Sequence, residues 1–167
     1  SDTQDIAYHR YGDAFSVMGK WIAENRVPMN IRYVVQTGDA VDNGASQRQW
    51  DSYDEMFNQF KDDIPYISVA GNHEVKKNGY LEFCARPEVQ AIPPDRSFEN
   101  GIGEYATFEA YGKRFLIIGA GYGEEQRAVP WINSVLRSHR DPVAILLFHD
   151  YLQTGGRFSI NGKSMFE

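Results

Sequence analysis

The sequence predicts an α/β fold whose strands end in polar residues. Three short apolar runs have the length and composition of buried strands, and they occupy residues 31–36, 64–70 and 143–148. The first run is followed by Asp39 and Asp42, the second by Asn72, His73 and Glu74, and the third by His149. Because α/β sheets bind ligands at the carboxyl ends of their strands, these endings predict a functional site.

Helical segments separate the first strands. Residues 13–25 place Phe15, Met18 and Ile22 at helical spacing, and Pro28 ends that helix. A second helix is predicted to begin at Ser46. It carries an aromatic stripe that we interpret as core packing and not as a substrate platform: Trp50, Tyr53, Phe57 and Phe60.

The second half of the chain adds a predicted β-hairpin. Residues 78–86 predict a short helix, and residues 87–100, which are rich in proline, predict a surface loop. A β-hairpin is predicted over residues 105–119. Two kinds of side chain alternate over 105–110, a turn follows, and residues 114–119 form an apolar strand. An amphipathic helix is predicted from about residue 126 to before Asp141, and another near residues 159–167.

The polar strand endings form an ordered set of motifs. A single Asp or Asn after a strand usually shapes a turn or caps a helix, because its side chain hydrogen-bonds the nearby backbone. Here Asp-Thr-Gln at 2–4 is followed by Gly-Asp-x-x-Asp at 38–42, Gly-Asn-His-Glu at 71–74 and His149. Their order, spacing and strand-end placement resemble the calcineurin-like metallophosphoesterases. The closer resemblance is to the bacterial branch with Asp-Thr-Gln, in which Gln4 stands where most relatives have His.

The resemblance implies an α/β sandwich of two mixed β-sheets flanked by α-helices (αββα). It also implies one metallophosphoesterase domain over residues 1–167, truncated at both ends. In the family, a central strand precedes the first motif and a Gly-His-x-His motif completes the metal shell. Here no apolar run precedes Asp2 and no such motif follows His149. We therefore expect both elements to lie outside this sequence.

The same resemblance implies two divalent metal ions. Asp39 is expected to bridge them, with Asp2 and Gln4 on the first ion and Asn72 and His149 on the second. Imidazole suits zinc, iron and manganese, whereas carboxylate and amide oxygens suit magnesium, calcium and manganese. Manganese is therefore favoured over iron or zinc, and the replacement of a His by Gln4 is expected to weaken the first site.

His73 is expected to act in the chemistry and not as a metal ligand. By the resemblance, the His after the liganding Asn lies over the phosphate, where it protonates the leaving oxygen or stabilises the transferred group. Glu74 is expected to orient this imidazole by accepting its ring N–H. Asp42 and Asn43 are interpreted as residues that shape the loop.

Composition narrows the range of partners. The net charge of the 167-residue chain is −6 and its Lys and Arg residues form no cluster, so neither nucleic acid nor an acidic membrane surface is an expected partner. Cys84 is the only cysteine, which rules out an internal disulfide and makes a thiolate zinc site implausible. The sequence has no apolar stretch long enough to span a membrane. It is compatible with a secreted, a cell-surface or a cytoplasmic location, and the oligomeric state is not predicted.

These features predict a dinuclear metal-dependent phosphoesterase, a hydrolase that uses metal-activated water on a small phosphate mono- or diester. Two alternatives stay open. The first is a catalytically silent binding domain of a larger protein, which keeps the framework without a complete metal shell. The second is a metal-dependent nuclease, against which the low basic content argues.

Overall fold

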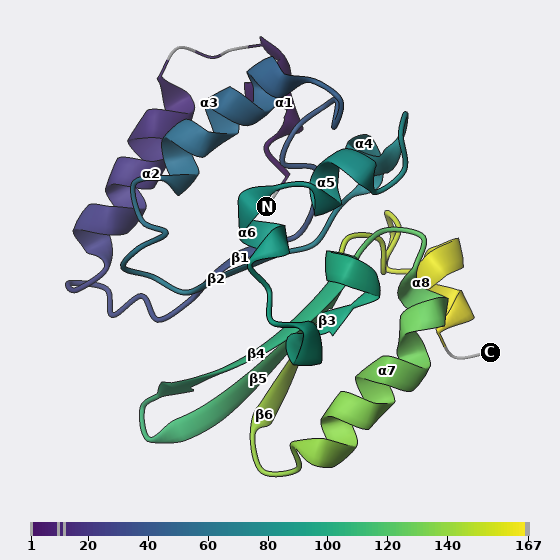
Figure 1. Cartoon of the computed structure of the whole chain (residues 1–167). Coiled ribbons are helices and arrows are strands. Elements are labelled where there is room, and N and C mark those ends of the chain that lie inside the picture. Colours follow the sequence, from purple (N-terminus) through teal and green to yellow (C-terminus); the bar gives the residue numbers. More distant parts are fainter. Residues whose placement is uncertain (1, 10, 12, 166–167) are drawn as a thin grey trace.

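Two β-sheets pack against one another, with helices on their outer faces (Figure 1). The computed structural model describes residues 2–9, 11 and 13–165. The first sheet has two parallel strands, β1 (Val34–Gln36) and β2 (Tyr66–Ser68). The second has four strands in the order β3 (Ser97–Phe98), β4 (Gly103–Ala110), β5 (Lys113–Ala120) and β6 (Val143–Phe148). Strands β4 and β5 form the predicted hairpin, and β6 pairs parallel to β5.

Alternation along β5 directs its side chains into two layers. Ile117 packs with Leu147 of β6 against Ile67 of β2 and Val69, the residue that follows this strand. On the opposite face, Leu116, Ile118 and Ala120 pack against helix α7 (Glu125–Ser138) through three of its residues, Ala128, Ile132 and Val135. The predicted αββα sandwich is thereby confirmed, with the difference that the two-stranded sheet is parallel throughout.

Helices α1 (Gln4–His9), α2 (Ala14–Asn25) and α3 (Gln47–Phe57) cover the first sheet (Figure 1). The aromatic stripe of α3 and the turn after it is buried, as predicted: Trp50, Tyr53, Phe57 and Phe60. Helix α1 was not predicted, because six residues with one buried side chain, Ala7, give no helical repeat to detect.

Short elements connect the two sheets. They are α4 (Asn72–Val75), α5 (Leu81–Cys84), α6 (Pro87–Gln90) and the 3-10 turns η1 (Pro94–Arg96) and η2 (Glu99–Gly101). The prediction of a plain surface loop over residues 87–100 was therefore wrong. Pro87 occupies the first turn of α6, where a missing backbone N–H costs no hydrogen bond. At the other end of the chain, α8 (Ile160–Ser164) lies within the predicted helical stretch.

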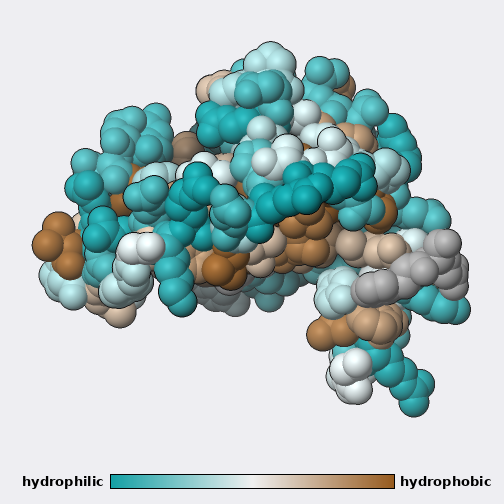
Figure 2. All heavy atoms as spheres, turned by 90° about the horizontal axis from the view of Figure 1, so that it is seen from below, coloured by the Kyte–Doolittle hydropathy of each residue, from teal (hydrophilic) through white to brown (hydrophobic). Residues whose placement is uncertain are grey.

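Strand β6 leaves apolar side chains exposed. Val143, Ile145 and Leu146 keep 50%, 41% and 45% of their surface accessible. Figure 2 shows the molecule from below, with hydrophobic residues gathered in a band between largely hydrophilic surroundings. No helix within the described ranges is long and apolar enough to cross a bilayer.

Candidate metal centre

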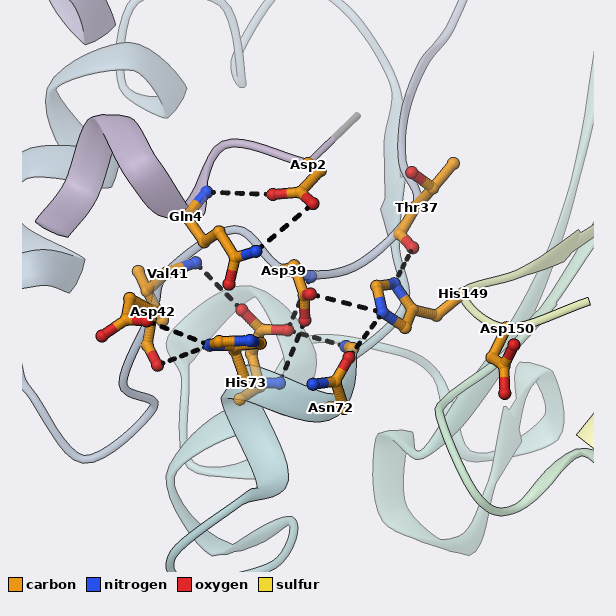
Figure 3. Close-up of polar contacts among 12 residues, drawn as sticks. Asp2, Gln4, Thr37, Asp39, Val41, Asp42, Asn72, His73, His149 and Asp150 are labelled. Atoms are coloured by element: carbon orange, nitrogen blue, oxygen red, sulfur yellow. Dashed lines mark hydrogen bonds and ion pairs between the residues drawn. The ribbon is translucent and has the colours of Figure 1, made fainter. Parts of the chain in front are cut away.

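The ends of β1, β2 and β6 bring three polar segments together (Figure 3). His149 follows β6, and its Nε2 lies 3.0 Å from Asn72 Oδ1 and 3.4 Å from Asp39 Oδ2. The backbone N–H of His73 donates to Asp39 Oδ1 at 3.0 Å. Residues far apart in the sequence thus meet around the Asp39 carboxylate, as their strand-end positions predict.

The imidazole of His149 is oriented by the loop after β1. Its Nδ1 lies 2.9 Å from the carbonyl oxygen of Thr37, which can only accept, so Nδ1 carries the hydrogen. Nε2 then faces the oxygens of Asp39 and Asn72. The hydrogen bond to Asp39, opposed by burial, raises the pKa of His149 to about 9. Burial raises the pKa of Asp39, but its bonds with His149 and His73 outweigh this, so that pKa lies below its usual value.

Two glycines make room for these side chains. Gly38 has φ +95°, and a Cβ there would lie 2.5 Å from His149 Nδ1. A Cβ on Gly71 would collide with Asp39 Oδ1, although the φ of Gly71 is −94°. Asp39 itself has φ +52°, a conformation that Asp tolerates better than most residues. The backbone is therefore shaped around the Asp39 carboxylate and the His149 ring.

The Glu74 carboxylate binds the backbone of both strand-end loops. It is 3% exposed and accepts hydrogen bonds from the N–H groups of Gly71 at 2.7 Å, Asp39 at 2.8 Å and Val41 at 2.9 Å. Burial raises its pKa, and the backbone hydrogen bonds oppose that shift. The expectation that Glu74 orients the His73 ring is corrected, because the carboxylate is engaged by these amides.

Asp42 is the residue that contacts the His73 ring. His73 Nδ1 lies 2.9 Å from the Asp42 carbonyl oxygen and 3.1 Å from its Oδ1. The interpretation of Asp42 as only a loop-shaping residue therefore missed a contact. Its place as the second Asp of Gly-Asp-x-x-Asp, shortly after a strand end, is the sequence signal that could have indicated it.

The first motif is tied to the Asp39 loop by Thr3. Its backbone N–H donates to the Asp39 carbonyl at 2.9 Å and its hydroxyl to the Ala40 carbonyl at 3.0 Å. Asp2 is exposed and accepts from Gln4 through both its oxygens, from the backbone N at 3.3 Å and from Nε2 at 3.5 Å. Figure 3 shows Gln4 on the side of Asp39 away from His149, and Asp2 above Asp39.

The donor atoms fit divalent ions in chemistry. Gln4 Oε1 is buried and has no hydrogen-bond partner among the described residues, which suits an oxygen that coordinates a cation. Across residues 2–9, 11 and 13–165, no group of three or more His, Cys, Asp or Glu side chains is arranged to hold an ion. That statement concerns His, Cys, Asp and Glu only, and two of the five predicted ligands, Gln4 and Asn72, are amides.

Comparison with known proteins identifies the family. The model of the calcineurin-like phosphoesterases matches residues 1–166. The chain therefore belongs to that family, as its motifs predict. The family is one of phosphoesterases, and its members generally use divalent metal ions.

Two relatives are much longer than this chain. The uncharacterized protein YvnB of Bacillus subtilis (strain 168) is 34% identical over 177 aligned residues, which cover 100% of this chain and 13% of YvnB. A probable cyclic nucleotide phosphodiesterase of Moraxella catarrhalis (strain BBH18) is 29% identical over 121 residues, which cover 68% of this chain and 42% of that protein. The chain thus spans less than half the length of either relative.

Proposed function

We propose that this chain carries the site of a dinuclear metal-dependent phosphoesterase. The observation that supports it most is the convergence on Asp39 of Asn72 and His149 on one side and the first motif on the other. Asp39 would be shared by the two ions, with Asp2 and Gln4 on one and Asn72 and His149 on the other. When bound, such ions polarise phosphoryl oxygens and make a water molecule acidic enough to attack at neutral pH.

His73 would contribute a proton or a hydrogen bond to the substrate. Its Nδ1 faces two acceptors of Asp42, so Nδ1 carries the hydrogen in the neutral ring and Nε2 is the atom left for the substrate. A ring fixed in this way can protonate a leaving oxygen or stabilise the transferred phosphoryl group. Glu74 would act indirectly, by holding together the loops that carry Asp39 and Asn72.

Manganese and a small phosphate ester are the proposed cofactor and substrate class. The donors comprise two carboxylates, two amides and one imidazole, a mixture that suits manganese better than zinc or iron. The name of the Moraxella relative makes a cyclic nucleotide a reasonable substrate to test beside simple aryl esters. The net charge of −6 disfavours a nucleic-acid substrate.

The test is metal analysis of the full-length protein together with hydrolysis of bis(4-nitrophenyl) phosphate in Mn²⁺. Asp39→Asn removes the shared charge, so we expect it to lose bound metal and at least about 100-fold in turnover. Asp5→Asn, at an exposed position of α1, is the matched control and should retain both. Unchanged metal stoichiometry in Asp39→Asn would refute the bridging role. Metal binding without turnover on any ester would favour the silent binding domain instead.

A further inference from the structure

The loop after β5 places an aromatic ring against His149. Tyr122 is half-buried, and its ring centroid lies 5.9 Å from that of His149 at an interplanar angle of 76°, an edge-on contact. Edge-to-face arrangements of this kind are favourable for aromatic rings. Neither the motif pattern nor the family match assigns a role to Tyr122.

Three contacts fix the backbone around Tyr122. Its N–H donates to the carbonyl of Ala70, at the end of the β2 run, at 2.9 Å. Its carbonyl accepts from the Tyr80 hydroxyl at 2.7 Å. The neighbouring Gly121 donates to the Ile102 carbonyl at 3.0 Å. This loop therefore joins the second sheet to the strand end that presents Asn72.

Tyr80 and Gly121 fit closely together. A Cβ on Gly121 would approach the Tyr80 ring to 2.9 Å at Cε1 and its hydroxyl even more closely. Tyr80 is itself half-buried and packs edge-on against Phe83, with ring centroids 6.5 Å apart. The hydroxyl that holds the Tyr122 carbonyl is thus on a side chain with little freedom to move.

We propose that Tyr122 is a positioning residue for His149 and that Tyr80 holds Tyr122 in place. The hydrogen bond from His149 Nδ1 to Thr37 holds one edge of the ring but does not by itself fix the tilt of its plane. The Tyr122 ring lies against the imidazole and limits this tilt, so Nε2 stays directed at Asn72 and Asp39. The effect on metal binding rests on the proposed function, whereas the effect on ring mobility does not.

The experiment measures Mn²⁺ affinity by calorimetry and, in metal-free protein, the exchange of the His149 Nδ1–H with water by NMR. Removal of a group that supports a metal ligand typically lowers metal affinity about 10- to 100-fold, and we expect about 10-fold for Tyr122→Ala, with faster exchange of the ring N–H. Tyr122→Phe should match the wild type, because the contact needs the ring and not its hydroxyl. Tyr80→Phe should lie between them. Tyr111→Ala, in the exposed turn of the hairpin, is the control.

Several outcomes would overturn the proposal. The first is a Tyr122→Ala protein whose Mn²⁺ affinity and His149 N–H exchange equal those of the wild type. The second is a Tyr122→Phe protein that loses as much Mn²⁺ affinity as Tyr122→Ala. The third is a rise in the KM of Tyr122→Ala with unchanged metal affinity, which would make Tyr122 a substrate contact. If Tyr122→Ala does not fold, the same Mn²⁺ affinity and N–H exchange are measured on Tyr122→Leu and Tyr80→Phe. If the wild type binds no divalent ion, the dinuclear function fails, and the exchange rate in metal-free protein still decides the role of Tyr122.

Discussion

At the scale of single residues, the pair of Asp42 and His73 determines which ring nitrogen faces the site. Both oxygens of Asp42 near Nδ1 are acceptors, at 2.9 and 3.1 Å. The His73 side chain is half-buried, so its imidazole cannot rotate without losing the hydrogen bond at Nδ1. The two histidines therefore differ: the His73 ring contacts Asp42, whereas Nε2 of His149 faces Asp39 and Asn72.

His73→Ala is expected to leave metal content unchanged and to lower turnover about 100- to 10,000-fold, because a general acid is lost and no ligand is removed. Asp42→Asn should give a smaller loss in turnover, about 10-fold, since the Asp42 carbonyl still accepts from the ring. Metal analysis and steady-state kinetics check both variants. A His73→Ala protein without metal would show that His73 is a ligand.

Glu104 makes stability depend on pH. Burial, offset in part by Arg96, raises the pKa of Glu104 to about 7. The folded protein therefore keeps this proton up to about pH 7, whereas the unfolded chain loses it near pH 4.5. The contribution to stability is complete below the unfolded pKa and is lost as the pH rises through about 7.

Glu104→Gln should remove that loss. We expect the variant to be more stable than the wild type at pH 8, by about 2 kcal/mol or a few degrees in Tm, and the difference to vanish near pH 4. Melting curves at several pH values measure it, with Glu109→Gln, exposed on the same strand, as the control. A Tm difference that does not change with pH would contradict the assignment.

At the scale of elements, Glu74 joins the ends of β1 and β2. Its carboxylate binds Asp39 and Val41 after one strand and Gly71 after the other. The ladder between these strands covers only three residue pairs, so few backbone hydrogen bonds hold them together. Much of the alignment of the two loops therefore depends on one buried side chain.

Glu74→Gln is expected to lower the free energy of unfolding by about 2–4 kcal/mol, because an amide has one acceptor oxygen for three buried N–H groups. Metal affinity should fall with it, since Asp39 and Asn72 lie on the loops that loosen. Denaturant unfolding and metal titration measure the two effects. Glu55→Gln, exposed on α3, should change neither, and a fully stable Glu74→Gln protein would contradict this role.

Sequence patterns predict the elements with a repeat long enough to detect. The α3 stripe, the β4–β5 hairpin and the strands before Asp39, Asn72 and His149 follow from periodicity and run length. Strands β1 and β2 are shorter than their apolar runs, because a strand extends only as far as its ladder, and they pair with each other over three residues. Single-turn helices such as α4 and α6 arise from local backbone contacts that leave no periodic signal.

The site was predictable to the level of segments but not of contacts. Strand ends and motif order indicate that Asp39, Asn72 and His149 lie together, and they do. Which of Asp42 and Glu74 contacts the His73 ring depends on the path of two loops in space. Tyr122 belongs to no motif, and its place depends on how the second sheet meets the first.

At the scale of the whole molecule, β6 is an open edge. On the side away from β5, no strand among the described residues pairs with it. A groove of about 620 Å³ runs between β6 and α7, lined largely by apolar side chains that include Ile132, Leu146 and Phe148. Exposed apolar strand edges promote association with other chains.

We therefore expect the 167-residue chain to self-associate through the exposed edge of β6. Light scattering should show less association for the double variant Val143→Lys, Ile145→Lys, whereas Val27→Lys, at an exposed position away from β6, should have no effect. Unchanged association in the β6 double variant would contradict this expectation.

The donors around Asp39 come from both sheets, since Asn72 follows a strand of the first and His149 a strand of the second. An ion held between them binds only when the two layers are packed together, so its binding free energy adds to the free energy of folding. At a free concentration 100 times Kd that linkage amounts to about 2.7 kcal/mol. Metal supply would then affect the stability of the folded sandwich as well as its chemistry, and a chelator would act on this protein as a mild denaturant.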